Sequence, residues 1–168
     1  MHIMARVWIV RDYERCSGCR LCEIACSLAH EGVVWPEASR IRILETKPGV
    51  TIPVLCLQCK DPPCVKACPT NALRVDEYTG AVVVGEGCVL CGKCIEACPA
   101  KIPRIIDGVK RAIICDLCGG DPACVKICNE AGFGALRLTR KPRSSVVNLY
   151  AMDPFKLSEL VEKKLYGE

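Results

Sequence analysis

Cysteine is the residue that most restricts how this chain can fold. Its 168 residues include 16 cysteines, and all of them fall into four quartets, each confined to a short stretch. The quartets are Cys16, Cys19, Cys22, Cys26; Cys56, Cys59, Cys64, Cys68; Cys88, Cys91, Cys94, Cys98; and Cys115, Cys118, Cys124, Cys128. The first and third have the spacing C-x2-C-x2-C-x3-C, and the other two widen the middle gap. This spacing is typical of 4Fe-4S clusters, so the sequence predicts four clusters with every ligand supplied.

The fourth cysteine of each quartet is expected to bind a different cluster from the first three. Three thiolates within about seven residues can surround one cluster, whereas the fourth lies about one helical turn further along. In two-cluster ferredoxins this fourth cysteine ligates the neighbouring cluster. Pro69 and Pro99 directly follow two of the fourth cysteines, where a proline ends a helix. The clusters are therefore predicted to form interlocked pairs.

Two other uses of cysteine compete with this interpretation. A disulfide scaffold would require an oxidising compartment, but no apolar export segment follows Met1, so we expect a cytoplasmic protein. Zinc knuckles share the C-x2-C spacing, but a zinc site usually combines two knuckles separated by a dozen or more residues. Four repeats of the ferredoxin spacing favour iron–sulfur clusters over both. A zinc-stabilised interaction module stays an alternative that metal analysis would recognise.

The charge and composition of the chain do not indicate a nucleic-acid partner. The formal net charge is +4, and four clusters would add about −8, which brings the loaded protein to about −4. Two Phe, two Trp and four Tyr are too few to form stacking platforms for bases, and basic residues occur only in short runs. No apolar stretch approaches the length that crosses a bilayer, so direct membrane insertion is not expected.

An internal repeat divides the sequence into two halves. Residues 61–68 recur as residues 121–128, and residues 22–26 are echoed by residues 94–98. Short helices are predicted to carry the third and fourth cysteines and to alternate with short strands. This alternation predicts the α+β class, with the ferredoxin-like plan used twice. The predicted strands cover residues 6–10, 40–44, 51–55, 72–75, 81–84, 105–106, 110–114 and 135–139.

The order of the quartets allows two ways of pairing the clusters. Sequential pairing joins quartets one and two and quartets three and four, whereas nested pairing joins two with three and one with four. Nesting is favoured, because only quartets two and three end in Cys-Pro. The hairpin predicted over residues 72–84 also has the length of a ferredoxin linker.

Four quartets in this order, with wider gaps in the second and fourth, resemble the four-cluster iron–sulfur subunits of molybdenum and tungsten oxidoreductases. This family includes the electron-transfer subunits of dimethyl sulfoxide reductase, formate dehydrogenase and formate hydrogenlyase, and the small subunit of some tungsten aldehyde oxidoreductases. The resemblance covers about residues 5–140 and implies nested pairing. The implied ligand sets are Cys16, Cys19, Cys22, Cys128; Cys115, Cys118, Cys124, Cys26; Cys56, Cys59, Cys64, Cys98; and Cys88, Cys91, Cys94, Cys68.

Nesting divides the chain into two ferredoxin-like dicluster domains and a tail. Residues 1–50 and 104–140 form the predicted outer domain, residues 51–103 form the inner domain, and residues 141–168 form the tail. The resemblance implies a relay between a catalytic subunit and ferredoxin or another electron carrier. The expected catalytic subunit is a tungsten or molybdenum pterin protein that acts on an aldehyde or on formate. A free polyferredoxin that serves several enzymes is the alternative.

Catalysis has no candidate residue in this sequence, so we expect a non-catalytic subunit. The radical-SAM and dinucleotide-binding signatures are absent. His30 is interpreted as a solvated residue near a helix end and not as a ligand or a base. Lys66, Lys93 and Lys126 lie beside cysteines, and they are interpreted as exposed surface lysines.

The tail is predicted to contain a short amphipathic helix. Asp153 supplies an N-cap and Pro154 the first helical position, and apolar residues then recur at helical spacing before Gly167. These apolar residues are Leu157, Leu160, Val161 and Leu165. The stripe could cover the chain's own fold or a partner. Docking of residues 144–168 on the catalytic subunit is the expectation.

Overall fold

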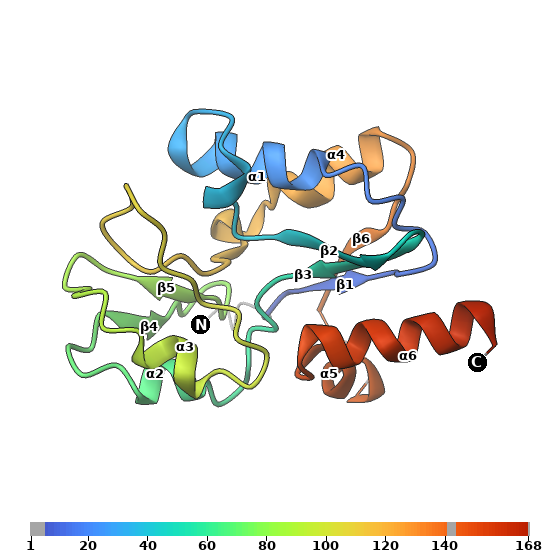
Figure 1. Ribbon diagram of the computed structural model, residues 1–168. Helices are drawn as coiled ribbons and strands as arrows, with labels where there is room; N and C mark the ends of the chain where they lie inside the picture. Colours follow the sequence, from blue (N-terminus) through green and yellow to red (C-terminus); the bar gives the residue numbers. More distant parts are fainter. Residues whose placement is uncertain (1–5, 141–143, 168) are drawn as a thin grey trace.

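The computed structural model describes residues 6–140 and 144–167. The strands are β1 (Trp8–Arg11), β2 (Arg42–Lys47), β3 (Val50–Val54), β4 (Leu73–Val75), β5 (Val82–Val84) and β6 (Leu136–Thr139) (Figure 1). The helices are α1 (Leu21–Glu31), α2 (Pro63–Lys66), α3 (Lys93–Ala97), α4 (Ala123–Glu130), α5 (Ser144–Tyr150) and α6 (Pro154–Tyr166), with 3-10 helices η1 (Pro36–Ala38) and η2 (Leu117–Gly120). None of the described helices is long and apolar enough to cross a membrane.

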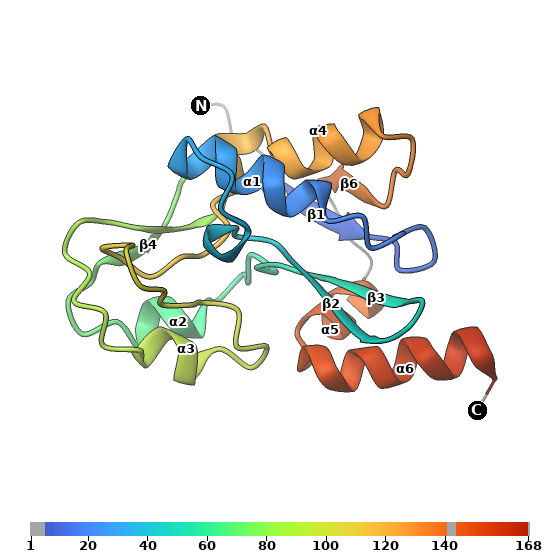
Figure 2. The same ribbon diagram turned by 45° about the horizontal axis from the view of Figure 1, so that its top comes forward.

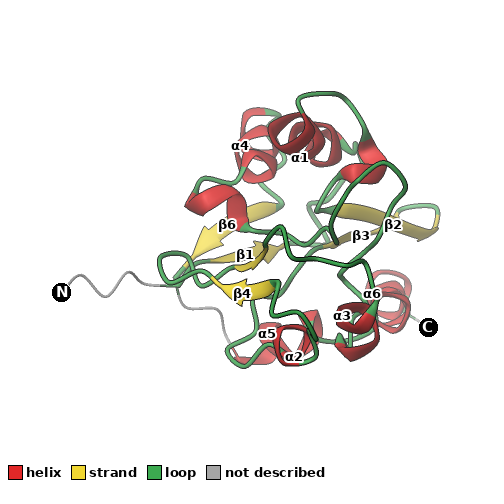
Figure 3. Ribbon diagram, turned by 90° about the vertical axis from the view of Figure 1, so that its left-hand side faces the viewer, coloured by secondary structure: helices red, strands yellow, loops and turns green. Residues whose placement is uncertain are grey.

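The elements form three layers. Helices α1 and α4 lie on one side of the strands, and helices α2, α3, α5 and α6 lie on the other side (Figure 3). The strands of the described residues pair as three antiparallel two-stranded sheets, β1–β6, β2–β3 and β4–β5. Because β1 pairs with β6, the two ends of the cysteine-rich region meet and the hairpins lie between them along the chain. The helices pair in the same nested way as the ends of the chain. Helix α1 packs on α4, and α2 and α3, which lie between them in the sequence, pack on each other. The predicted α+β class with ferredoxin-like units is confirmed.

Two of the predicted strands do not form. Residues 105–106 are not a strand, and residues 110–114 contribute only an isolated bridge between Arg104 and Ile113. Ala112 and Ile114 are buried with Leu73 and Val82 in the core around the β4–β5 hairpin. The apolar residues of this segment are therefore buried without a complete ladder of hydrogen bonds. Their sequence pattern is that of a strand because burial, and not strand pairing, sets it.

Packing crosses the predicted domain boundaries. Strand β3 belongs to the residue range of the inner domain, yet it pairs with β2 of the outer domain. Conversely, Ala112 and Ile114 belong to the residue range of the predicted outer domain, but they are buried in the core of the inner domain with Leu73 and Val82. The two ferredoxin-like units thus share a continuous set of contacts through residues 50–54 and 112–114.

Helix α6 forms as predicted, but its apolar stripe covers the chain's own fold. The Asp153 carboxylate accepts hydrogen bonds from the backbone N–H groups of Phe155 and Lys156, and the helix ends at Gly167 with φ 76°. Figure 2 shows α6 alongside the β2–β3 hairpin, where Leu157 and Val161 pack against the apolar residues of β3. Two residues of the stripe, Leu157 and Val161, are thus covered by the chain's own fold, whereas Leu160 and Leu165 are 45% and 39% exposed. Docking of the tail on a catalytic subunit stays a prediction.

Candidate iron–sulfur sites

The structure gathers twelve of the cysteines around three cavities. Each cavity combines three cysteines of one quartet with the fourth cysteine of another. We name them site I, site III and site IV, and they are lined by Cys16, Cys19, Cys22, Cys128; by Cys56, Cys59, Cys64, Cys98; and by Cys68, Cys88, Cys91, Cys94, respectively. These groups match three of the ligand sets that the family resemblance implies.

The other four cysteines, Cys26, Cys115, Cys118 and Cys124, form a group that we name site II. They lie close enough to affect one another electrostatically: Cys26 and Cys118 raise the pKa of the Cys124 thiol, and Cys124 and Cys26 raise that of Cys115. Burial is the larger cause in both cases. Helices α1 and α4 hold this group together, since α1 carries Cys26, α4 carries Cys124, and the two helices pack on each other.

The raised pKa values of the thiols fit a cationic iron–sulfur core bound by these cysteines as thiolates. Burial is the main cause, and neighbouring negative groups add to it, so that the pKa of Cys22 and Cys56 is raised to about 12 and that of Cys64 to about 11. Four buried thiolates without a cation would repel one another, whereas iron ions deprotonate thiols and stabilise them as ligands. Bound 4Fe-4S clusters would supply one-electron redox chemistry, and the chain's own residues position them and set their surroundings.

Backbone geometry around the thiols fits the same group. Several non-glycine residues in the cysteine loops have positive φ, which turns successive N–H groups toward one side of the loop and creates an anion-binding concavity. These residues are Arg20, Gln58, Leu90, Leu117 and Cys118. The backbone N–H groups of Gln58, Arg40 and Ala112 donate to the sulfurs of Cys56, Cys26 and Cys88, at 3.4, 3.2 and 3.4 Å. Such N–H···S bonds stabilise the negative charge of a cluster.

A buried arginine lies between sites II and III. Arg11 is only 5% exposed, and no carboxylate of the described residues pairs with it. Its Nη2 donates to the Leu55 carbonyl at 2.8 Å, its guanidinium lies 4.0 Å from the centre of the Tyr150 ring, and its Nε has no hydrogen-bond partner. Burial lowers the pKa of Arg11, and the thiolates of Cys56 and Cys115 oppose this. An isolated buried cation is unfavourable unless an anion lies nearby, and negatively charged clusters at these two sites would meet that requirement.

His30 differs from the sequence interpretation, because it is not a solvated residue. Its side chain is 14% exposed and lies at the end of α1 against site II. One ring nitrogen, Nε2, is 3.0 Å from the Asp116 carboxylate, and the other, Nδ1, is 2.8 Å from the Cys26 carbonyl oxygen and 3.8 Å from the Cys26 sulfur. Both nitrogens face acceptors, and the pKa of His30 is raised to about 12, chiefly by Asp116. His30 therefore presents a positive charge to site II.

The three lysines beside cysteines are exposed and form surface ion pairs, as the sequence interpretation expected. Lys66 pairs with Asp61 at 2.6 Å, and Lys126 pairs with Asp121 at the corresponding position of the repeat. Lys93 lies 3.9 Å from Glu96. Sequence reasoning missed the buried Arg11 and the half-buried Asp116, although Asp116 directly follows a cysteine and Arg11 directly follows the strand predicted over residues 6–10.

Comparison with known proteins assigns these cysteine sites to a family. A family described as a 4Fe-4S dicluster domain matches residues 49–138, which is more than half of the chain, and a 4Fe-4S binding domain matches residues 13–31. The chain belongs to the 4Fe-4S ferredoxin family. The match confirms the prediction of several 4Fe-4S clusters. The names of the relatives describe the protein complexes in which such ferredoxins occur.

Relatives of this ferredoxin are subunits of oxidoreductases. The polyferredoxin-like subunit of aliphatic sulfonate oxidoreductase from Pyrococcus furiosus is 53% identical over 167 residues, which are 99% of this chain and 96% of the relative. The iron–sulfur subunit of nitrate-inducible formate dehydrogenase from Escherichia coli is 33% identical over 146 residues, covering 70% of this chain and 49% of the relative. The solved BamBC complex of benzoyl coenzyme A reductase with zinc matches 96% of this chain and 92% of its own, at 23% identity and a TM-score of 0.46, which is too distant to support an argument.

The names of these relatives, a polyferredoxin-like subunit and an iron–sulfur subunit, agree with the expected electron-transfer subunit of an oxidoreductase complex.

Proposed function

We propose that this ferredoxin binds four 4Fe-4S clusters and relays electrons, in the cytoplasm, between a tungsten or molybdenum pterin subunit and ferredoxin or another carrier. The observation that carries the proposal is the full set of sixteen cysteines gathered into four groups, in a chain that matches an oxidoreductase subunit over 99% of its length. The metal type of the partner rests on the order of the quartets. The substrate of the partner is an aldehyde, formate or, as in the name of the 53% identical relative, an aliphatic sulfonate.

Nested cluster pairing follows from the ligands that we propose. Sites I and II belong to the outer unit, formed by residues 1–50 and 104–140, and sites III and IV belong to the inner unit, residues 51–103. The cavities of sites I, III and IV support these ligand sets, because each contains the cross-quartet cysteine that nesting requires: Cys128, Cys98 and Cys68. Sequential pairing would instead place Cys128 with the third quartet, far from Cys16 and Cys19.

Electrons would pass through the sites in the order I, II, III, IV. Cys22 of site I affects the pKa of Cys124 of site II, and Cys56 of site III affects that of Cys115 of site II. Sites III and IV exchange their fourth cysteines, so they are neighbours. Cys19 of site I and Cys91 of site IV are the exposed cysteines of the chain. The terminal sites are thus the ones that solvent and partners can reach, as a relay requires.

Metal analysis of the native complex tests this function. Purified without oxygen from its source organism, the ferredoxin should contain about sixteen iron and about sixteen acid-labile sulfide per chain. Tungsten or molybdenum should elute with it. About eight iron after reconstitution would contradict the four clusters, and a fully loaded chain that elutes without tungsten or molybdenum would indicate a free polyferredoxin. Zinc in place of iron would indicate an interaction module.

A fragment tests the nested ligand sets. Residues 55–114 contain all ligands proposed for sites III and IV, and they also contain Ala112 and Ile114 of the inner core. This fragment should therefore fold and hold two clusters, or about eight iron. A matched fragment that ends at residue 110 keeps every ligand but lacks these two buried residues, so it should lose its clusters faster. Sequential pairing predicts that neither fragment holds a complete 4Fe-4S cluster.

A further inference from the structure

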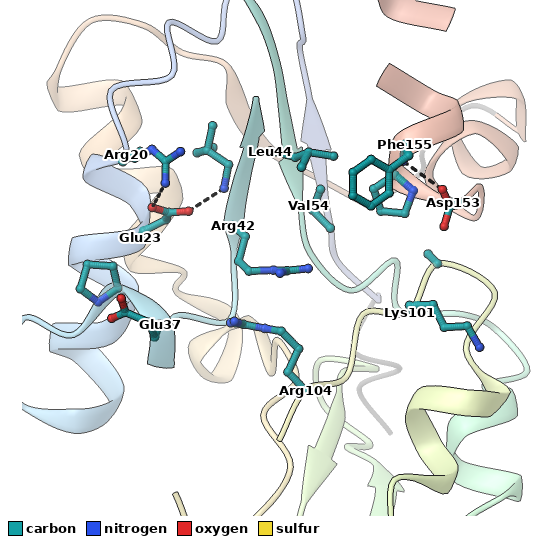
Figure 4. A pocket seen from close by; sticks show the side chains of 14 residues that line it. Arg20, Glu23, Glu37, Arg42, Leu44, Val54, Lys101, Arg104, Asp153 and Phe155 are labelled. Carbon is teal, nitrogen blue, oxygen red and sulfur yellow. Dashed lines mark hydrogen bonds and ion pairs between the residues drawn. The ribbon is translucent and has the colours of Figure 1, made fainter. Parts of the chain in front are cut away.

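A cleft of about 490 Å³ lies where the outer unit, the inner unit and the start of helix α6 meet (Figure 4). Four basic residues line it: Arg20 from the first cysteine loop, Arg42 from β2, and Lys101 and Arg104 from the segment after α3. Apolar side chains, including Leu44, Val54 and Phe155, form another part of its wall. The cleft thus combines positive charge with apolar surface.

The carboxylates of the cleft leave its central cations unbalanced. Glu23 is buried and already engaged, because it accepts from the Ile43 N–H at 2.6 Å and lies 3.6 Å from Arg20. Asp153 caps helix α6. No hydrogen bond or ion pair joins Glu37 to Arg42 or Arg104 among the residues drawn (Figure 4).

Arg42 and Arg104 form a like-charged pair at the centre of this cleft. Their side chains enter the same cleft from β2 and from the segment after α3 and lie near each other there (Figure 4). The Arg104 side chain donates to the Ser39 carbonyl, whereas Arg42 pairs with Val54 through its backbone and its side chain makes no hydrogen bond or ion pair with a described residue. The pKa of Arg104 is lowered to about 10, chiefly by burial and then by Arg42, and Glu23 opposes this shift only in part. Two guanidinium groups that lie together without an anion repel each other, and a carboxylate bound by both would remove that repulsion.

The cleft lies beside the cavities of two proposed cluster sites, and this position relates it to electron transfer. Arg20 and Ile43 line both the cleft and the cavity of site I, and Ala100 lines both the cleft and the cavity of site III. Any group seated there would be separated from two cluster sites by single side chains. A protein that exchanges electrons with this chain must approach a cluster closely, so a surface beside two of them suits a redox partner better than a small metabolite.

We propose that this cleft receives an acidic segment of the catalytic oxidoreductase subunit. A carboxylate of that segment binds Arg42 and Arg104, and a neighbouring apolar side chain packs on Phe155, which is 62% exposed. This inference rests on the proposed function, because it requires a catalytic partner. It adds to that function the surface on which the partner docks and the chemistry that recognises it.

Charge reversal at the arginine pair tests the proposal. The full chain, tagged and expressed in its source organism, would be purified without oxygen as wild type, as Arg42→Glu with Arg104→Glu, and as Lys110→Glu with Lys163→Glu. The last variant has the same change in charge at two exposed lysines outside the cleft. Iron reports cluster content, and tungsten plus molybdenum per chain reports the partner. The cleft variant should keep its iron and retain at least tenfold less partner metal, and the control should match wild type.

Three outcomes would overturn the docking site: equal partner metal in the cleft variant and wild type, equal loss in the control, or loss that persists unchanged across salt concentrations. Salt should weaken the wild-type complex, because exposed charges are screened. If the wild-type chain carries no tungsten or molybdenum, the proposed function fails first and the docking site fails with it. If the double variant loses iron, Arg42→Glu alone carries the test with the same expectation, because its side chain is exposed and has no partner to lose.

Discussion

Replacing Arg11 by methionine should lower the midpoint potentials of the clusters at sites II and III and leave those at sites I and IV nearly unchanged. The guanidinium is buried beside Cys56 and Cys115, and no carboxylate of the described residues neutralises it. A cluster gains negative charge when it is reduced, so a nearby fixed cation favours the reduced state. A unit charge acting over about 10 Å at an effective dielectric constant of about 20 contributes roughly 1.7 kcal/mol, or roughly 70 mV for a one-electron couple.

Two further variants separate the charge of Arg11 from its packing. Arg11→Lys keeps the positive charge and should restore most of the potential, although it loses the contact with the Tyr150 ring. Arg137→Met removes an exposed arginine from the paired strand β6 and should change no potential. Redox titration followed by electron paramagnetic resonance would measure all four clusters. Unchanged potentials in Arg11→Met, with about sixteen iron still bound, would show that Arg11 has no electrostatic effect on the relay.

Ligand grouping was predictable from the sequence because it depends on local geometry. The first three cysteines of a quartet are close in sequence, and the fourth is displaced by a helical turn, so spacing indicates that the first three share a cavity and that the fourth belongs to another. Spacing left the choice between sequential and nested pairing open, and the complete ligand sets were implied by the family resemblance. The same holds for helix α6, whose N-cap Asp153 and terminal Gly167 are local signals. The interaction of His30 with Asp116 was not predictable, since it joins residues that are 86 positions apart.

Amphipathicity was informative about helix α6 but not about its neighbour. The apolar stripe of a helix shows that one face is covered without naming what covers it. In the structure β3 is buried along its whole length, and α6 supplies one side of that burial. Apart from Thr51, strand β3 consists of apolar residues, and a strand covered on both faces needs a second layer. That requirement, taken together with the stripe, indicates that the tail belongs to the fold.

Leu157→Ala should destabilise the protein by about 2–5 kcal/mol, the usual effect of truncating a fully buried leucine. Leu157 is 2% exposed and packs in a cluster with Val50, Ile52 and Val54. Leu160 lies on the same helix and is 45% exposed, so Leu160→Ala is a matched control that should change stability by less than about 0.5 kcal/mol. The midpoint of guanidinium unfolding, followed without oxygen by the visible absorbance of the clusters, would measure both. Equal midpoints would show that the burial of Leu157 is not needed.

The same contacts predict that loss of the tail damages site I before the other sites. The hydroxyl of Thr51 on β3 donates to the Cys16 carbonyl at 2.7 Å, and Gly18, with φ 73°, leaves no room for a side chain because a Cβ would lie 2.8 Å from Thr51. Strand β3 therefore supports the loop that carries the ligands of site I, and α6 supports β3. Deleting residues 153–168 removes α6 but keeps Tyr150 and Ala151, which line the cavity of site III. The shortened chain should hold fewer than sixteen iron and should lose the cluster at site I first. A truncated chain that keeps about sixteen iron but no longer carries tungsten or molybdenum would instead support the docking role expected of the tail.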